Sequence, residues 1–534
     1  MADRGMLIEL RADRTPITEL APLQYDTPIG GDRPLAALVA PADGPFREVA
    51  TTARDALRRR TGLELPVLDD DGLFDAAQLP THLIAIGHAG ANRLLRRLHY
   101  AGYLAHEDYP SDGLQVTSVH SPLGDGHNVL AALGATPRVA EASVRRLVER
   151  VSEGDDGWCV AGRMQEVEPV PEAPDTAEIL ARAAEVTADA GGRPGHFLQC
   201  LRWLRRTGEE RWARAFVETL EPYATGRIPL SFKLMSAVDF WTHELVMLWD
   251  ACEAFEWFAE ADRLMATNFV VACGQYCHDS LTYQKWRIVE DEHQVFNHHT
   301  FPALGLAFTV MYLRRRGYEL AELDDWQDKA SRTFARAAEA GRSFDEGGSG
   351  YSWLVPRHLM QARFAAGDLS WARGPKLRHC ADLAIMVQNN RFETVPYGDC
   401  GSYHATGTGA AEVLLRAAEF HGHPGSRWVA QQHAPEQAER DIFARDLPAQ
   451  PPERHLGLFV LPLDPVIHRW AGLPRFPGYP PPPVMPNVPP DECFDKLTLR
   501  GGWGADDDYL LLQGFGDGQH GHPDANAISQ CPAR

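Results

Sequence analysis

The stretch Glu166–Thr176, EVEPVPEAPDT, separates two parts of the chain whose sequence patterns differ. Three prolines among acidic residues predict an exposed linker, so we place a domain boundary there. Before it, residues 36–151 alternate short apolar runs such as LAALVA and HLIAIG with amphipathic stretches such as FREVATTARDALRRRTG. This alternation predicts an α/β domain, to which we assign residues 1–165.

After the linker, residues 177–445 form a succession of amphipathic segments of helical length, broken by Gly or Pro. The pair GHFLQCLRWLRRTGEERWARAFVETLEPY is one example. Helical hairpins in series can form a bundle, a solenoid or a closed α/α toroid. The sequence shows no fixed repeat period, which argues against the solenoid.

A proline cluster at 476–490, FPGYPPPPVMPNVPP, is incompatible with a compact helix. It is followed by DKLTLRGGWGADDDYLLLQGF, in which an alternating stretch, an Asp/Gly turn and an apolar run predict the start of an antiparallel sheet. We assign residues 455–534 to this sheet. Because two or three strands are marginally stable alone, we expect the sheet to pack on the helical domain or to continue in a longer natural protein.

Composition and charge restrict the partners and the compartment. The formal net charge of -21 over 534 residues repels nucleic acid and anionic membranes. The N-terminal MADRGMLIELRADR lacks the apolar run of a signal peptide, so we expect a cytoplasmic protein, or a secreted one if the natural N-terminus is longer. The nine cysteines show no CxxC or repeated spacing, which is typical of free thiols.

Asn297, His298 and His299 are adjacent in NHHTFPALG, at the entrance of the apolar segment ALGLAFTVMYLRRRG. One interpretation is structural, in which Thr300 or Asn297 caps a helix and Pro302 occupies its first turn. Capping accounts for one polar residue rather than three. The segment is therefore also a candidate catalytic site.

Two glycine-rich segments present further candidate residues. DEGGSGYSWLVPRH brings Tyr351, Arg357 and His358 into an aromatic-rich stretch, and PYGDCGSYHATGTG places Tyr403 and His404 before another helix. The structural alternative for both segments is a loop whose aromatic residues are core anchors.

A histidine-rich segment, FGDGQHGHPDANAIS, follows the apolar strand DYLLLQGF. Its His520, His522 and Asp524 alternate, so they lie on one face of an extended chain. Imidazole and carboxylate groups suit zinc, whereas a polar surface hairpin accounts equally well for the spacing. We expect no organic cofactor.

Together, NHHTFPALGLAF, GGSGYSW and DKLTLRGGW…DYLLLQGFGDGQHGHPDANAI resemble the heparinase II/III-like polysaccharide lyases, which include the oligoalginate lyases. The resemblance runs from about residue 230 to the end. It implies a multidomain α+β fold in which a central (α/α) toroid precedes an antiparallel β-sandwich, of which this sequence shows the start. The first 150 residues or so resemble the small α/β sandwich domain that precedes the catalytic part of α-glucuronidases and family 20 hexosaminidases.

The chemistry of such lyases explains the residue types. β-Elimination at a uronate needs donors that neutralise the carboxylate, a base for the C5 proton and an acid for the leaving O4. Asn297 and His520 suit the first task by resemblance. His298 and Tyr351 suit the base and acid tasks, and the sequence leaves open which of them is the base.

The remaining candidates are substrate contacts and a metal ligand. His299, Arg357, Tyr403 and His404 are candidate substrate contacts, and the resemblance makes His522 a ligand of a structural zinc (Zn2+) site. The expected partner is an anionic polysaccharide or oligosaccharide, without nucleic acid or membrane, and a homo-oligomer is a possible assembly. Which uronic-acid glycan is cleaved, and whether in endo or exo mode, stays open.

Two other functions compete with the lyase. An α/α-toroid glycoside hydrolase requires two carboxylates that flank the scissile bond, for which Asp291, Glu292, Asp345 and Glu346 are candidates. A non-catalytic carbohydrate-binding protein would instead stack sugars on Trp and Tyr side chains. The lyase alone produces an unsaturated uronate, which distinguishes the three.

Overall fold

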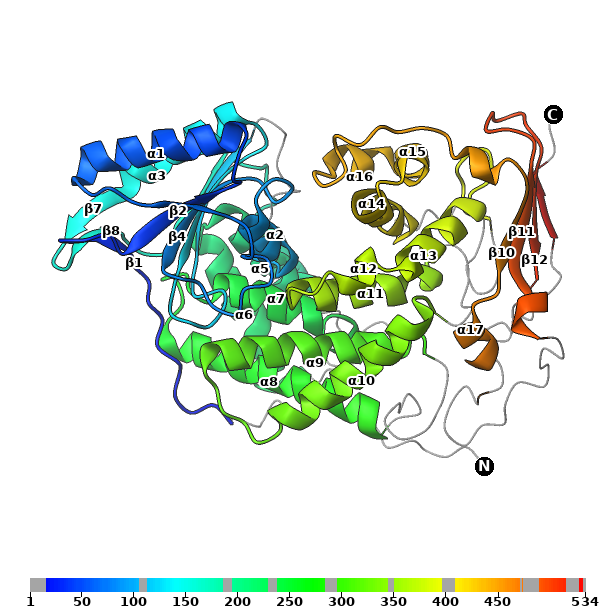
Figure 1. Cartoon of the computed structure of the whole chain (residues 1–534). Helices are drawn as coiled ribbons and strands as arrows, with labels where there is room; N and C mark the ends of the chain where they lie inside the picture. The colour runs from blue at the N-terminus through cyan, green and yellow to red at the C-terminus, as the bar shows by residue number, and fades with distance from the viewer. Residues whose placement is uncertain are drawn as a thin grey trace.

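The computed structural model describes residues 16–104, 113–185, 195–228, 238–283, 295–343, 350–395, 409–470, 473, 489–514 and 528–531. Along the chain, an α/β region is followed by a long helical region and then by an antiparallel sheet (Figure 1). The predicted fold class, a multidomain α+β protein, is confirmed.

A six-stranded sheet forms the centre of the α/β region. Its order is β3 (Val67–Asp69), β2 (Ala36–Ala40), β4 (His82–Gly87), β6 (Val129–Gly134), β5 (Leu114–Val119) and β9 (Gln165–Glu168). The first four strands are parallel, while β5 and β9 are antiparallel to their neighbours. The sequence places the linker from Glu166, whereas the sheet extends to Glu168 because β9 pairs with β5.

Helices cover both faces of this sheet. α1 (Pro45–Thr61) and α3 (Pro137–Arg150) share a core on one face, and α2 (Arg93–Tyr100) packs on the other (Figure 1). Burial on both faces explains why the central strands are continuous apolar runs. A smaller sheet, β1 (Thr27–Gly30), β8 (Gly157–Val160) and β7 (Val151–Gly154), flanks this arrangement.

The helical region consists of helices that pack against their neighbours in the chain. The described helices are α4 (Thr176–Ala184), α5 (Gly195–Thr207), α6 (Glu210–Ala224), α7 (Thr242–Cys252), α8 (Glu260–Tyr283), α9 (Asn297–Arg316), α10 (Leu323–Ala340), α11 (Tyr351–Ala365), α12 (Ser370–Arg373), α13 (Pro375–Met386), α14 (Gly409–His421), α15 (Pro424–His433), α16 (Pro435–Arg440) and α17 (Pro465–Trp470). Successive helices such as α5 and α6, or α9 and α10, pack side by side as hairpins. None of the helices in the described ranges is both long and apolar enough to cross a membrane.

α9 is the helix around which its neighbours gather. It packs against α7, α8, α10 and α11, and its apolar residues face all sides. A helix that is apolar all round belongs in a core. Gly305 allows a close approach, since a Cβ atom there would lie 2.7 Å from Cys277 Sγ on α8 and 3.1 Å from Thr242 Cβ on α7.

The C-terminal sheet has the antiparallel order β10 (Gly457–Pro462), β11 (Phe494–Arg500), β12 (Tyr509–Gln513) and β13 (Ile528–Cys531). One face docks on the helical region through polar contacts. Tyr509 Oη donates to the Met386 carbonyl (2.6 Å), and Arg500 Nη2 donates to the Gln388 carbonyl (2.6 Å). Of the two expectations for this sheet, packing on the helices is therefore observed.

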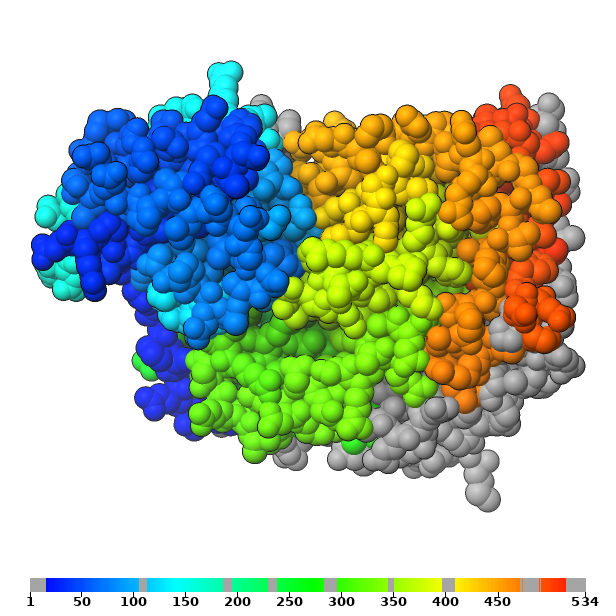
Figure 2. Space-filling model, in the orientation of Figure 1, coloured from blue at the N-terminus to red at the C-terminus, as the bar shows by residue number. Residues whose placement is uncertain are grey.

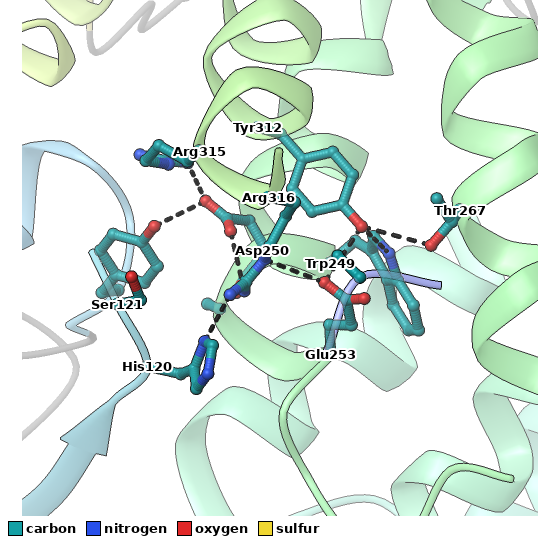
Figure 3. A network of polar contacts seen from close by, with 12 residues as sticks. His120, Ser121, Trp249, Asp250, Glu253, Thr267, Tyr312, Arg315 and Arg316 are labelled. Atoms are coloured by element: carbon teal, nitrogen blue, oxygen red, sulfur yellow. Dashed lines mark hydrogen bonds and ion pairs between the residues drawn. The ribbon is translucent and has the colours of Figure 1, made fainter. Parts of the chain in front are cut away.

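A buried polar network joins the α/β region to α7 and α9 (Figure 3). Asp250 on α7 accepts hydrogen bonds from Tyr103 Oη (2.7 Å) and Arg316 Nη2 (3.2 Å), and it also pairs with Arg315. Arg316 Nη1 lies 2.5 Å from Nδ1 of His120, which follows β5. Only 3% of the Asp250 side chain and 4% of the Arg316 side chain are exposed, so these charges are satisfied by one another rather than by solvent.

Glu253 extends the network one turn further along α7. It accepts from Tyr312 Oη (3.0 Å) and Arg263 Nη2 (3.2 Å), and Trp249 Nε1 donates to the same tyrosine oxygen (3.1 Å). The side chain is 1% exposed. The two regions are thus held in one relative orientation by paired charges and not by apolar contacts alone.

Candidate functional site

A cavity of about 990 Å³ lies between the α/β region and the helical region. Its wall on the α/β side comes from α2 and the residues after it, and its other walls come from α5, α7, α9, α11, α14 and α16. In Figure 2 the α/β region, in blue, meets the yellow and orange helices along a seam, and the cavity is lined from both sides of it. The N-terminal domain therefore helps to form the cavity.

Aromatic contacts hold the α2 wall in place. Tyr100 stacks on Phe443 with ring centroids 5.4 Å apart, and it packs on Phe364 of α11 at 4.6 Å. Arg416 of α14 donates to Tyr100 Oη (3.2 Å) and lies over the Phe443 ring at 4.5 Å. These contacts combine ring packing with a cation over an aromatic face.

One face of α11 lines the cavity along most of its length. Leu354, Arg357, His358 and Gln361 are spaced at three and four residues, which places them on one side of a helix. Tyr351, the first residue of the helix, belongs to the same face because it precedes Leu354 by three residues and His358 by seven. Its side chain is 38% exposed. The predicted catalytic tyrosine thus continues the stripe of residues that lines the cavity.

The structure corrects the predicted capping of α9. The helix begins at Asn297 with Phe296 in the N-cap position, so neither Asn297 nor Thr300 is the cap. His299 Nδ1 instead accepts the Phe296 N–H (3.3 Å), and its ring packs against Phe296 at 4.4 Å. Pro302 lies in the second turn rather than the first. His299, which is fully buried, therefore has a structural role at the helix start.

Of the other two residues of this segment, His298 lies next to the cavity wall. Asn297 is 2% exposed, and His298 is half-buried between Phe240 and Phe296, with ring centroids 5.5 and 5.8 Å away. Phe240 lines the cavity and contacts Phe301 of α9 at 4.5 Å. The start of α9 and the start of α11 are therefore both close to the cavity.

Arg357 is the predicted substrate contact that lines the cavity directly. Its Nε donates to Glu412 Oε2 of α14 (2.6 Å). The same helix end approaches α11 closely, since a Cβ atom on Gly409 would lie 2.8 Å from Trp353 Cβ and 3.4 Å from Arg357 Cδ. With Nε engaged, the two Nη groups of the guanidinium remain as donors for a carboxylate ligand.

Two histidines line the cavity, of which His358 belongs to a segment singled out in the sequence and His243 does not. His243 on α7 and His358 on α11 have ring centroids 6.1 Å apart, and His358 Nδ1 lies 2.8 Å from Thr300 Oγ1. Burial lowers the pKa of His243 to about 4 and that of His358 well below 6.5, so both are neutral at neutral pH. His358 was a candidate because it ends the glycine-rich segment that contains Tyr351, whereas His243 lies in no motif.

The remaining predicted residues, Tyr403, His404, His520 and His522, lie outside the described ranges. Within those ranges, no group of three His, Cys, Asp or Glu side chains is arranged to hold a metal ion. Zinc binding through His522 stays a prediction of the sequence.

Comparison with known proteins gives similarity to solved structures alone, since no protein-family model and no curated protein matches the chain. A structure described as "Heparinase III-BT4657 gene product" has a TM-score of 0.39 and 9% identity over 74% of this chain. Another, a crystal structure of heparinase III, has a TM-score of 0.38 and 10% identity over 63%. The chain spans 59% and 48% of the lengths of these two proteins. Both TM-scores are below 0.5, so these similarities carry no conclusion about the activity of this chain.

Proposed function

We propose that this protein is a polysaccharide lyase that cleaves a uronic-acid glycan or oligosaccharide by β-elimination and leaves a 4,5-unsaturated uronate end. The observation that carries the proposal is the α11 face, on which the exposed Tyr351 continues the stripe of cavity-lining residues that includes Arg357 and His358. A bound glycan in the cavity would bring a sugar ring toward the starts of α9 and α11.

The proposed roles follow from what each group can donate or accept. Arg357 binds a uronate carboxylate through its Nη groups, which positions the ring. Asn297 and His520 neutralise the carboxylate next to C5, so that the C5 proton becomes acidic enough to leave. His298 and Tyr351 exchange the protons at C5 and O4. Tyr403 and His404 complete the predicted set around the substrate, whereas His299, which is fully buried, acts through the start of α9.

The test is the ultraviolet absorbance of the conjugated alkene formed on a panel of uronic-acid polysaccharides. Tyr351→Phe, which removes one phenolic O–H, is expected to abolish the absorbance rise while the protein still binds the glycan. The matched control is Tyr25→Phe, because Tyr25 is half-buried and does not line the cavity. Absence of any rise with the folded wild-type protein on every substrate would refute the lyase.

The hydrolase alternative has one specific observation in its favour, since two glutamates of the cavity, Glu244 and Glu412, could flank a sugar. Each forms an ion pair with an arginine, Glu244 with Arg202 (2.5 Å) and Glu412 with Arg357 (2.6 Å). The four carboxylates first considered, Asp291, Glu292, Asp345 and Glu346, lie outside the described ranges. New reducing ends without alkene absorbance would identify a hydrolase.

A further inference from the structure

The side chain of His358 is held in one orientation at the inner wall of the cavity. It is 5% exposed, and its ring packs edge-on against Phe301 with centroids 4.3 Å apart. Its Nδ1 lies 2.8 Å from Thr300 Oγ1, on the neighbouring helix α9. Among the residues that the structure describes, Thr300 is the hydrogen-bond partner of this ring, and it engages Nδ1 only.

The hydrogen bonds of Thr300 indicate which nitrogen of His358 carries the proton. A threonine hydroxyl has one hydrogen to donate and two lone pairs that accept. Thr300 Oγ1 donates to the carbonyl of Asn297, 3.1 Å away in the first turn of α9. The contact with His358 then requires Nδ1–H to donate to Thr300 Oγ1, which leaves Nε2 as a bare acceptor.

The ring is also uncharged, so the Nε2 lone pair is available. Burial lowers the pKa of His358 well below 6.5, and the charge of Arg357 lowers it further. Because His358 lines the cavity, this acceptor is open to a ligand that supplies a donor. A sugar hydroxyl is such a donor, and Arg357, the adjacent residue, is positioned for a carboxylate of the same ligand.

We propose that His358 is a further substrate-contacting residue whose Nε2 accepts a hydrogen bond from a free sugar hydroxyl, and that Thr300 is the positioning residue that holds the Nδ1–H tautomer. The ligand class, a uronic-acid glycan, rests on the proposed function. An ester such as O-sulfate has lost the hydroxyl hydrogen and presents only acceptors to Nε2. The site therefore selects glycans that are unsubstituted at the contacted hydroxyl.

The tautomer is tested without any ligand, by long-range ¹H–¹⁵N correlation spectra of protein labelled at histidine, at about pH 8, where an ordinary histidine is neutral. His433 is the internal reference, because its Nδ1 lies 2.9 Å from the Phe392 carbonyl, which can only accept. His358 is expected to match His433 in the wild type and in Thr300→Ser, and to lose the match in Thr300→Val. An Nε2–H signal for wild-type His358 would overturn the positioning role.

The contact with substrate is tested by two variants of His358, each of which retains one of the two hydrogen-bonding groups of the ring. His358→Asn retains a donor toward Thr300 but no acceptor at the Nε2 position, whereas His358→Gln places an acceptor there. His358→Asn is expected to weaken binding of a uronic-acid oligosaccharide and to raise KM by about tenfold with a smaller change in kcat, and His358→Gln to restore most of the loss.

Calorimetric titration separates this inference from the proposed function. If the wild type binds and cleaves the oligosaccharide but His358→Asn binds it equally well, the contact is refuted while the lyase stands. If the wild type neither binds nor cleaves any uronic-acid glycan, the lyase and the contact fail together, and the tautomer spectra still decide the role of Thr300. Equal wild-type affinity for O-sulfated and unsulfated oligosaccharides would refute the selection against substituted hydroxyls.

Discussion

Replacing Asp250 with Asn tests whether paired charges hold the α/β region on the helices. The substitution keeps the size of the side chain and removes one of two carboxylates, Asp250 and Glu253, that face the guanidinium groups of Arg316 and its neighbours. The carboxylate is almost fully buried, and it accepts from Tyr103 as well as from Arg316. Water cannot replace it without opening the contact between the two regions.

The expected loss follows from the environment of Asp250. Removing one partner of a buried ion pair costs about 3 to 5 kcal/mol because the other charge stays desolvated. The lower end applies here, since the amide oxygen still accepts and Glu253 still pairs with Arg316 at 3.1 Å. Unfolding of the α/β region alone, roughly 150 residues, has an entropy of about 0.3 kcal/mol/K, so a loss of about 3 kcal/mol lowers its Tm by about 10 °C. Unfolding of the whole chain as one unit would give about 3 °C.

Differential scanning calorimetry measures both the shift and the number of transitions. The matched control is Asp324→Asn, in which the exposed carboxylate pairs with Arg314 (2.6 Å), next to the same arginines of α9. An exposed pair contributes little, so this variant is expected to melt as the wild type does. If Asp250→Asn lowers the Tm no more than Asp324→Asn does, the network does not hold the two regions together and the reasoning is refuted.

Three further predictions follow from the cavity and from α9. Arg357→Ala is expected to raise KM for a uronic-acid oligosaccharide by about tenfold or more with a smaller effect on kcat, measured by initial rates, and an unchanged KM would exclude a carboxylate contact. Gly305→Ala is expected to cost about 1 to 3 kcal/mol in urea unfolding because its Cβ meets Cys277 Sγ, whereas Gly195→Ala, with nothing within 4 Å, is neutral. Because burial lowers the pKa of His243 from 6.5 to about 4, the unfolded chain binds more protons than the folded one between these values. Stability is then full above pH 6.5 and falls toward pH 4, and His243→Gln should lose less stability on acidification in calorimetric scans.

Local patterns predicted the elements of this fold well. The amphipathic stretch FREVATTARDALRRRTG forms α1, which Gly62 ends as a left-handed C-cap with φ 78°. The strand runs LAALVA and HLIAIG form neighbouring strands of the central sheet. The linker prediction was displaced by a few residues, because Gln165–Glu168 gains hydrogen bonds from β5 that no local pattern announces. Such pairing depends on a strand about fifty residues away.

The residues of the candidate site were likewise predicted only in part from the sequence. The sequence singled out the starts of α9 and α11 because histidine, amide and tyrosine side chains gather there. It misplaced the helix cap, since Phe296 occupies the N-cap position and His299 accepts its backbone N–H. It did not reveal His243, which lies in an ordinary amphipathic helix and becomes significant only beside His358.

The sequence by itself determined the order of the three regions and the chemical types available at the motifs, because these depend on neighbours within a few residues. Only the tertiary structure decided which surfaces meet. Tyr100 reaches Phe364 and Phe443, and Thr300 reaches His358, across separations that helical periodicity does not encode. Periodicity indicates that a helix has a face to bury, but the partner of that face is selected by the sum of many non-local contacts. The cavity, built from α2, α7, α11 and α14 together, is a product of that selection.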